Sequence, residues 1–294
     1  MLDFLPEAMR EPTVLAIPFF ALMLGLELWA AAKLEHLDEE SRPPKGSYSR
    51  RDTQASLLMG VVSIGTSAVT KVIALLGYTA IFAYLAPWEL PIYAWYTWVI
   101  GFVALDFLFY WQHRIAHRVR LVWATHQAHH SSEYYNFATA LRQKWNNSMS
   151  MIMWLPLPLL GIPPAVVFAV YSLNLIYQFG VHTERVDRLW RPVEFVLNTP
   201  SHHRVHHGSD PEYLDRNYGG VFILWDRMFG SFARESFRPT YGLTTPVGTY
   251  NIVTLQTHEY LSLARDVAGA DRLRDKLGYV FGPPGWAPRT LTDR

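Results

Sequence analysis

The chain has 294 residues, of which 50% are hydrophobic and 15% aromatic, and its formal net charge is only +1. It has no basic stripe of the kind that neutralises a phosphate backbone, so nucleic acid is not an expected partner. It contains no cysteine, which excludes disulfides and cysteine-ligated zinc fingers and leaves the redox compartment undetermined.

Two long apolar runs follow a short acidic N-terminal piece. The first, residues 13–32, is about 20 residues long, enough to cross the hydrocarbon core of a bilayer, and Glu27 is the one charge in it. The N-terminal piece lacks the basic region of a signal peptide, so we expect a retained transmembrane helix. A polar stretch at 35–53 is typical of a loop. The second run, 55–86, predicts a crossing that is tilted or has an extra interfacial turn.

Two further apolar regions complete the expected membrane part. Residues 92–111 begin with tryptophan and tyrosine, as is common near lipid headgroups, and continue without a break into His113. Residues 149–179 have prolines and a glycine near their centre and predict a hairpin of two half-length or full crossings. About four transmembrane helices are therefore expected. By the positive-inside rule the histidines are cytoplasmic, because basic residues gather on one side, in 42–51, 114–120, 142–144 and beyond 185.

Ten of the twelve histidines fall within residues 113–207. Histidines four apart share one face of a helix, so each motif presents a pair of imidazoles. His129 and His206, each three residues after the first histidine of its pair, add a nitrogen that can bind a second metal. Imidazole suits iron, zinc, copper and nickel, and the number of nitrogens matches a dinuclear site. A lone histidine is more often a hydrogen-bonded core residue, but spaced motifs together indicate a metal site. The motifs are His113-x-x-x-His117, His126-x-x-His129-His130 and His202-His203-x-x-His206-His207, with His182 between the last two.

Asp106 lies on the same predicted helix face as the first histidine motif. A carboxylate in an apolar span is costly without a partner, so Asp106 either orients an imidazole or bonds a neighbouring helix. Asn174, Gln178 and His182 are spaced by four, which turns their shared face toward the histidine cluster and makes His182 a candidate ligand.

A substrate that enters from the bilayer would pass between aromatic residues of the third and fourth apolar regions. Packing or lipid-facing roles are the commoner explanation for any one of these aromatics. The residues that we expect to contact substrate are Trp95, Trp98, Phe102, Trp111, Asn174 and Gln178.

The motifs and their surroundings resemble the fatty acid hydroxylase and sterol desaturase superfamily of membrane-bound di-iron oxygenases, and within it the monooxygenases of ether lipids. The resemblance covers about half of the chain, residues 100–245. Besides the histidines it rests on His130-Ser-Ser-Glu133, His182-Thr-Glu184, Asn198-Thr-Pro-Ser201, Asn217-Tyr218-Gly219, Trp225-Asp226-Arg227 and Phe229-Gly230.

This resemblance implies a membrane anchor of about four helices under a cytosolic helical cap, with two iron ions that activate O2 and attack a C–H bond of an ether lipid, acyl chain or sterol-like lipid. The implied ligands are His113, His117, His126, His129, His130, His182, His203, His206 and His207. Further ligands, or residues that orient the ligands, are sought among His202, Asp106, Glu133, Asn198 and Asp226. Purified protein could carry zinc in place of iron.

We expect a single membrane-embedded domain over 1–294, in a bacterial cell membrane rather than an endoplasmic reticulum. Its parts are transmembrane helices at 12–112, histidine motifs at 113–147, the hairpin at 148–181, further motifs and the cap at 182–250 and a cytosolic tail at 251–294. Electrons must come from an external protein or reductant, with tetrahydrobiopterin implied by the resemblance, because the sequence lacks a dinucleotide-binding Gly-x-Gly-x-x-Gly or haem motif.

Three alternatives stay open. A desaturase on the same di-iron site would remove two hydrogens and insert no oxygen, and the histidine motifs do not distinguish it from a hydroxylase. A zinc-dependent membrane hydrolase is less favoured, since the chain has no His-Glu-x-x-His with its general-base glutamate. A metal transporter or sensor is also less favoured, because the histidines lie at and beyond the expected membrane boundary and do not line a path through it.

Overall fold

The computed structural model describes residues 12–34 and 44–288. Within these ranges every regular element is a helix, and the only extended pairings are two isolated bridges, Leu197 with Phe222 and Gly208 with Tyr241. The expected all-helical class is confirmed. The acidic N-terminal piece, much of the polar stretch at 35–53 and the last residues of the tail lie outside the described residues.

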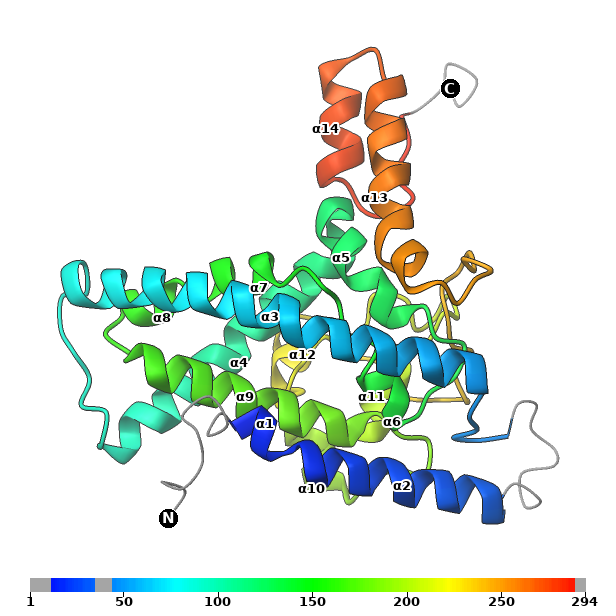
Figure 1. Cartoon of the computed structure of the whole chain (residues 1–294), viewed down its shortest axis with the longest axis horizontal. Coiled ribbons are helices and arrows are strands. Elements are labelled where there is room, and N and C mark those ends of the chain that lie inside the picture. The colour runs from blue at the N-terminus through cyan, green and yellow to red at the C-terminus, as the bar shows by residue number, and fades with distance from the viewer. Residues whose placement is uncertain (1–11, 35–43, 289–294) are drawn as a thin grey trace.

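In the part of the chain that the structure describes, three helices are long and apolar enough to cross a membrane: α2 (Ile17–Leu34), α3 (Arg50–Tyr84) and α9 (Pro164–Val181). The one-turn helix α1 (Pro12–Leu15) precedes α2. Figure 1 shows α2, α3 and α9 running alongside one another across the molecule. Much of their apolar surface points outward, including Ile73 and Leu76 of α3 at 66% and 69% exposure. Side chains of this kind are stable on the outside of a protein only against lipid or a partner.

The other expected crossings take a different form. The third apolar region lies in α4 (Trp95–Arg118), where the aromatic N-terminal half and the polar, histidine-bearing C-terminal half keep the helix below the hydropathy of the other three. The first arm of the expected hairpin is broken into α7 (Ser148–Met153) and α8 (Pro156–Leu159). Gly161 ends this arm with φ +78, and a Cβ there would lie 2.4 Å from the carbonyl oxygen of Trp88. Only glycine fits that turn.

The histidine motifs lie where these long helices converge, at one end of the bundle (Figure 1). The elements that carry or surround them are α5 (Arg120–His130), α6 (Phe137–Ala140), α10 (Arg191–Val196), α11 (Pro200–His206) and α12 (Leu224–Met228). Helix α11 begins with a capping box between Thr199 and His202 and has Pro200 in its first turn, which fixes where the third motif enters its helix.

The main apolar core lies toward the other end of the bundle, where α3, α4 and α9 pack against α7 and α8. Its fully buried side chains include Leu105, Trp154, Leu157 and Val166. Helix α2 is attached by Glu27, which is only 4% exposed although it is the one charge of the first apolar run. Its carboxylate accepts hydrogen bonds from the backbone N–H of Phe137 at 2.8 Å and from the hydroxyls of Tyr48 and Thr183.

The C-terminal region, expected as a tail, contains two helices, α13 (Ile252–Gly269) and α14 (Leu273–Phe281), which form a hairpin. In Figure 1 this hairpin projects away from the rest of the molecule, crosswise to α3 and α9. Its base is packed on the bundle, where Leu255 lies in a small core with Ala55, Met59 and Ala128.

Candidate metal centre

The structure gathers nine histidines into two adjacent groups. His113, His117, His126, His130 and His206 form the first, and His129, His182, His203 and His207 form the second. Within each group the nitrogens that could bind a metal all lie within 4.8 Å of one another. Every motif contributes to the site through the helix that carries it, and both the second and the third motif contribute to both groups. These nine are the same histidines that the sequence puts forward as ligands.

The groups are shaped like coordination shells. In the first, Nε2 of His126 lies 2.9 Å from Nε2 of His113 and 3.1 Å from Nε2 of His130. In the second, Nε2 of His182 lies 3.3 Å from that of His129 and 3.1 Å from that of His203. Metal–nitrogen bonds of about 2.1 Å at right angles would separate neighbouring ligand nitrogens by about 3 Å. The spacing therefore suits one metal ion in each group.

Backbone carbonyls hold four of the imidazoles by their other nitrogen. Nδ1–H of His113 donates to the Tyr218 carbonyl at 2.9 Å, and His129, His182 and His206 donate in the same way to Arg142, Gln178 and Arg216. A neutral imidazole that donates from Nδ1 has a lone pair at Nε2. The Nε2 atoms of His129 and His182 thus face each other with lone pairs, an arrangement that a cation between them would stabilise.

Other imidazole nitrogens in the site are buried without a hydrogen-bond partner. These are Nε2 of His117, His206 and His207 and Nδ1 of His203. A buried polar nitrogen with no partner costs free energy, so such a cluster calls for an explanation, and metal binding supplies one. Burial lowers the pKa of His206 to about 4, and it lowers the pKa of His182 to about 4 against the opposing hydrogen bond to Gln178. Both imidazoles are therefore neutral, as ligands must be.

A buried carboxylate fixes the carbonyl that orients His113. Asp226 is fully buried and accepts hydrogen bonds from the backbone N–H of Tyr218 at 2.8 Å, from that of Gly219 at 2.7 Å and from the Ser231 hydroxyl at 2.7 Å. Asp226 thus touches no histidine. It acts on the first group through the backbone of Tyr218.

A buried ion pair performs the corresponding role for the second group. The Arg142 guanidinium, 1% exposed, meets Asp52 of α3 at 2.5 Å and also donates to Ser56 and Ser131. The carbonyl of the same Arg142 accepts the Nδ1 hydrogen bond from His129 at 3.2 Å. Sequence reasoning missed Asp52, and its signal was only a carboxylate beside Arg50 and Arg51 at the start of the second apolar run.

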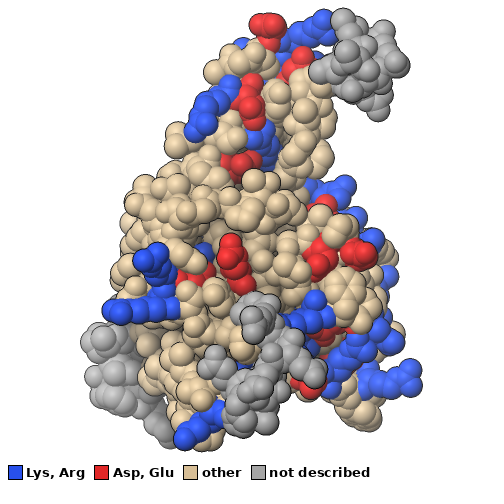
Figure 2. Space-filling model, turned by 90° about the vertical axis from the view of Figure 1, so that its right-hand side faces the viewer, with Lys and Arg blue, Asp and Glu red and all other residues tan. Residues whose placement is uncertain are grey.

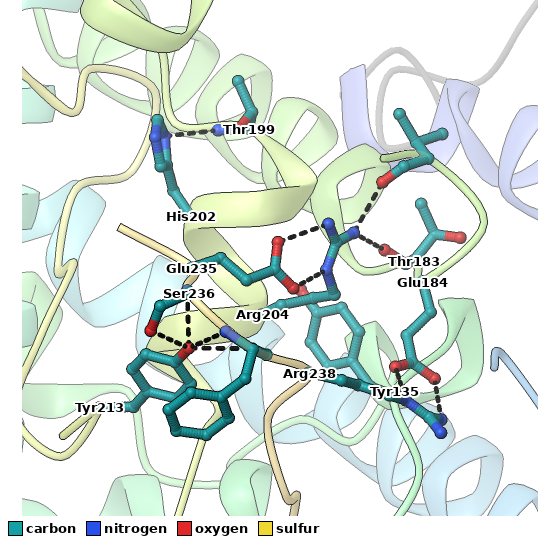
Figure 3. Close-up of polar contacts among 12 residues, drawn as sticks. Tyr135, Thr183, Glu184, Thr199, His202, Arg204, Tyr213, Glu235, Ser236 and Arg238 are labelled. Atoms are coloured by element: carbon teal, nitrogen blue, oxygen red, sulfur yellow. Dashed lines mark hydrogen bonds and ion pairs between the residues drawn. The ribbon is translucent and has the colours of Figure 1, made fainter. Parts of the chain in front are cut away.

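Further ion pairs brace the third motif from its outer side (Figure 3). Arg204, next to His203, makes a two-pronged contact with Glu235 at 2.7 and 2.8 Å and donates to the carbonyls of Thr183 and Val186. Arg238 pairs in the same manner with Glu184. Two-pronged guanidinium–carboxylate contacts fix geometry as well as charge, so they attach α11 and the segment after His182 to the stretch at 235–238. The hydrogen bonds from Arg204 to the two carbonyls join α11 to that segment directly.

His202 lies outside both groups. Its Nε2 is 3.0 Å from Glu194 of α10, and its Nδ1 lies 3.2 Å from the carbonyl oxygen of Leu197 (the contact with Thr199 is drawn in Figure 3). As the neighbour of His203 on a helix, it projects from a different face. Of the two roles expected for His202, a tenth ligand or a residue beside the ligands, the contacts with Glu194 and Leu197 favour the second, which stays a prediction.

The side chains of Asp106, Asn174 and Gln178 hydrogen-bond to one another and not to the imidazoles. Asp106 accepts hydrogen bonds from Asn174 at 2.7 Å, from the Trp225 indole at 2.9 Å and from the backbone N–H groups of residues 221 and 222. The alternative of an inward carboxylate bonded to a neighbouring helix is the one observed. Gln178 donates to Asn174 at 2.5 Å, so both amides proposed for substrate contact are engaged within the protein.

Two other candidates lie away from the imidazoles. Glu133 is exposed, and its side chain packs against Gly242. Asn198 is fully buried and donates to the carbonyls of Gly219 and Gly220, so it supports the same loop that Asp226 holds. Neither belongs to the histidine groups.

The aromatic candidates for a substrate path are spread along α4. Trp95 is 75% exposed at the start of the helix, and the indole of Trp98 donates to the Ile92 carbonyl. Phe102 meets Phe222 edge-on at 6.1 Å, and Trp111 contacts Phe229 at 5.0 Å. At about 100° per residue, Trp95, Trp98 and Phe102 share one side of α4 and Trp111 falls on roughly the opposite side, so the four do not line a single path.

One aromatic residue beside the second group was missed as a candidate. Tyr135 is 1% exposed, stacks on His182 at 5.7 Å and lies 5.1 Å from His207. Its hydroxyl donates to the carbonyl of Val181. Nothing in a local sequence pattern places Tyr135 against His182, since they are brought together by the return of α9 to the site.

Comparison with known proteins agrees with the geometry. The chain is 48% identical over 201 residues to alkylglycerol monooxygenase of Danio rerio, covering 68% of this chain and 45% of that protein. It is 39% identical over 292 residues to the Homo sapiens alkylglycerol monooxygenase, covering 98% and 62%. An ornithine lipid hydroxylase of Rhizobium tropici is 29% identical over 136 residues, covering 46% and 41%. The chain thus spans only about half of the length of these relatives.

No solved structure matches the chain significantly. The model of the fatty acid hydroxylase family matches residues 98–231, which contain all nine grouped histidines. This part of the chain, with all nine grouped histidines, therefore belongs to the fatty acid hydroxylase family.

Proposed function

We propose that the protein is an O2-dependent di-iron oxidoreductase that hydroxylates a C–H bond of a membrane lipid. The observation that carries this proposal is the division of nine buried histidines into two neighbouring groups with ligand-like spacing. The first group would hold one iron through its five imidazoles, and the second would hold the other through its four. When bound, an iron pair of this kind supplies the redox chemistry that an unactivated C–H bond requires and that no side chain can provide.

The residues of the chain itself supply position and a dry environment. Carbonyls of residues 142, 178, 216 and 218 hold imidazole rings with their lone pairs turned inward. The neutral ligand set carries no carboxylate, so the positive charge of the metals is not offset within either group. The buried aromatic residues around the groups exclude water, which would otherwise compete with the lipid for the reactive centre.

An alkylglycerol or another ether lipid is the substrate class that the relatives favour, because two of them are named alkylglycerol monooxygenases. The electron donor would be a separate protein or small reductant, for which a reduced pterin is one choice.

The proposed topology places the histidine end of the bundle in the cytoplasm, most simply beneath a bacterial cell membrane. It comprises the three long apolar helices and α4 as crossings, with α7 and α8 as a broken, partly inserted arm. Basic residues in the loops at this end support the orientation. Residues 182–250 would then cap the two metals, within one membrane-embedded unit.

Product analysis tests the proposal. Purified protein in lipid vesicles would be supplied with iron, a reductant, an alkylglycerol and isotopically labelled O2. Incorporation of one labelled oxygen atom into the lipid is expected. An unsaturated, unlabelled product would instead identify a desaturase on the same site. O2-independent hydrolysis with zinc bound, and no oxidised lipid with iron, would contradict the proposed chemistry.

A further inference from the structure

The C-terminal hairpin carries an apolar stripe that no part of the described chain covers. On α14, Leu273, Leu277 and Phe281 are 70%, 48% and 61% exposed. They are spaced by four residues and so form one line along the helix. Among the residues of α14 none is buried.

The remaining faces of α14 are already occupied or polar. Gly278 lies directly under the Trp286 ring, where a Cβ would come within 2.1 Å of the indole. Tyr279 contacts the same Trp286 at 5.3 Å and lies under the guanidinium of Arg120. The hairpin is thus attached through one face of α14, and the stripe lies on another.

Two cations border the stripe. At about 100° per residue, Arg274 and Lys276 fall on either side of the line through Leu277, and Asp275 falls opposite it. Long basic side chains beside an apolar stripe can extend their charges to phosphate groups while their stems cover apolar surface. This arrangement is typical of a helix lying in a membrane interface.

The position of the hairpin brings this stripe to the bilayer. Leu255, at the base of α13, packs on Ala55 and Met59, where the polar start of α3 gives way to its apolar run. That is the level of the lipid headgroups in the proposed orientation. In Figure 1 the hairpin extends crosswise to α3 and α9, with α14 on the side toward α8. Figure 2 looks from the opposite, histidine-bearing end and shows the hairpin presenting charged side chains to that side.

We propose that the α13–α14 hairpin is an interfacial arm whose α14 stripe inserts among the lipids on the histidine-bearing side of the membrane. The arm extends the contact of the protein with the bilayer beyond its crossing helices. This inference rests on the proposed membrane orientation. A second copy of the chain is the competing occupant of the stripe and is distinguished by the test.

Single cysteines test the arm, and the chain offers a clean background because it has no natural cysteine. Leu277→Cys reports on the stripe, Asp275→Cys is the control on the opposite face of α14, and Ile73→Cys reports on the outside of α3. Each variant would carry an environment-sensitive fluorophore in vesicles of equal parts phosphatidylcholine and phosphatidylglycerol. Quenching by nitroxide-labelled lipids would be compared with quenching by aqueous iodide.

The expected result is a blue-shifted emission at position 277, strong quenching by the nitroxide lipids and a several-fold loss of iodide quenching relative to position 275. Equal iodide quenching at 277 and 275 would overturn the inference. Protection at 277 from both quenchers, with energy transfer between differently labelled copies, would also overturn it in favour of a dimer. Loss of lipid quenching at position 73 would instead refute the membrane orientation.

An unlabelled variant guards against insertion driven by the dye itself. In vesicles, Leu277→Asp should raise hydrogen exchange across residues 273–281 several-fold. Exchange at the base of α13, measured in the same sample, should change little. Unchanged exchange in α14 would contradict the inserted arm.

Discussion

The imidazole of His113 donates from Nδ1 to the carbonyl oxygen of Tyr218 over 2.9 Å, across 105 residues of sequence. The N–H of the same Tyr218 donates to Asp226 at 2.8 Å. The ligand is therefore oriented by a loop, and the loop by a carboxylate that accepts three hydrogen bonds. Supports of this kind commonly influence metal affinity nearly as much as the ligands do.

Asp226→Asn should weaken the first metal site without removing a ligand. The new amide would place an N–H₂ group against a backbone donor, so the loop would shift and His113 would lose its fixed orientation. We expect metal affinity, measured by competition with a chelator, to fall about 10- to 100-fold. Asp187→Asn, at an exposed carboxylate, is the control. Equal affinities in the two variants would show that the carboxylate does not support the site.

Arg142 and Asp52 should act as a unit at the second site. Removing one partner of a buried ion pair leaves an uncompensated charge, which costs about 3–5 kcal/mol. Asp52→Ala should therefore lower the thermal midpoint markedly and reduce metal content. The double change Asp52→Leu with Arg142→Met should recover part of the stability. Additive losses in the double variant would indicate that the two side chains are not coupled.

His202 and His203 should differ sharply although they are neighbours. His203→Ala removes a member of the second histidine group and should eliminate about one metal ion per chain. His202→Ala removes contacts with Glu194, Leu197 and Thr199 but no member of either histidine group, so both metals should stay, and the free energy of unfolding should fall by about 1–3 kcal/mol. Elemental analysis and thermal unfolding would separate these outcomes. Loss of metal in His202→Ala to the same extent would place His202 among the ligands.

Gly220 should tolerate no side chain. A Cβ there would lie 2.7 Å from Oδ1 of Asp106 and 2.9 Å from the Phe109 ring, so Gly220→Ala should cost about 1–3 kcal/mol by overpacking. Gly180→Ala is the matched control, because a Cβ at that helical position meets nothing within 4 Å. It should leave stability unchanged or raise it slightly. Unfolding followed by tryptophan fluorescence compares the two, and equal midpoints would mean that the loop moves freely.

Much of the site could be predicted because its information is local. Spacing by three and four within each motif determines which imidazoles share a face, and His182 could be found from its register with Gln178. The class of the fold followed from long apolar runs. The nine histidines that the structure groups together need no long-range contact to be recognised as a set.

The rest depends on contacts between distant segments. His202 has the same residue type as the ligands, and only the position of Glu194 on α10 shows that it bonds elsewhere. Asp106 lay on the right face but is engaged by Asn174 and by backbone at 221 and 222. The prolines at 156 and 158 were visible in the sequence, but they do not by themselves show that the crossing is broken into α7 and α8. The buried partners of Glu27 could have been expected from the sequence, because a lone carboxylate in an apolar run needs a partner.

The most direct test of the two-group site is the metal content of detergent-purified protein and of two variants. His126→Ala changes only the first group, His207→Ala only the second, and His258→Ala is a control at a histidine outside both. We predict about two irons per chain in the wild type and in the control, and about one in each group variant, with the coupled-iron Mössbauer signal lost in both. One metal ion per chain in the wild type, or two metal ions retained in either group variant, would contradict two separate metal positions.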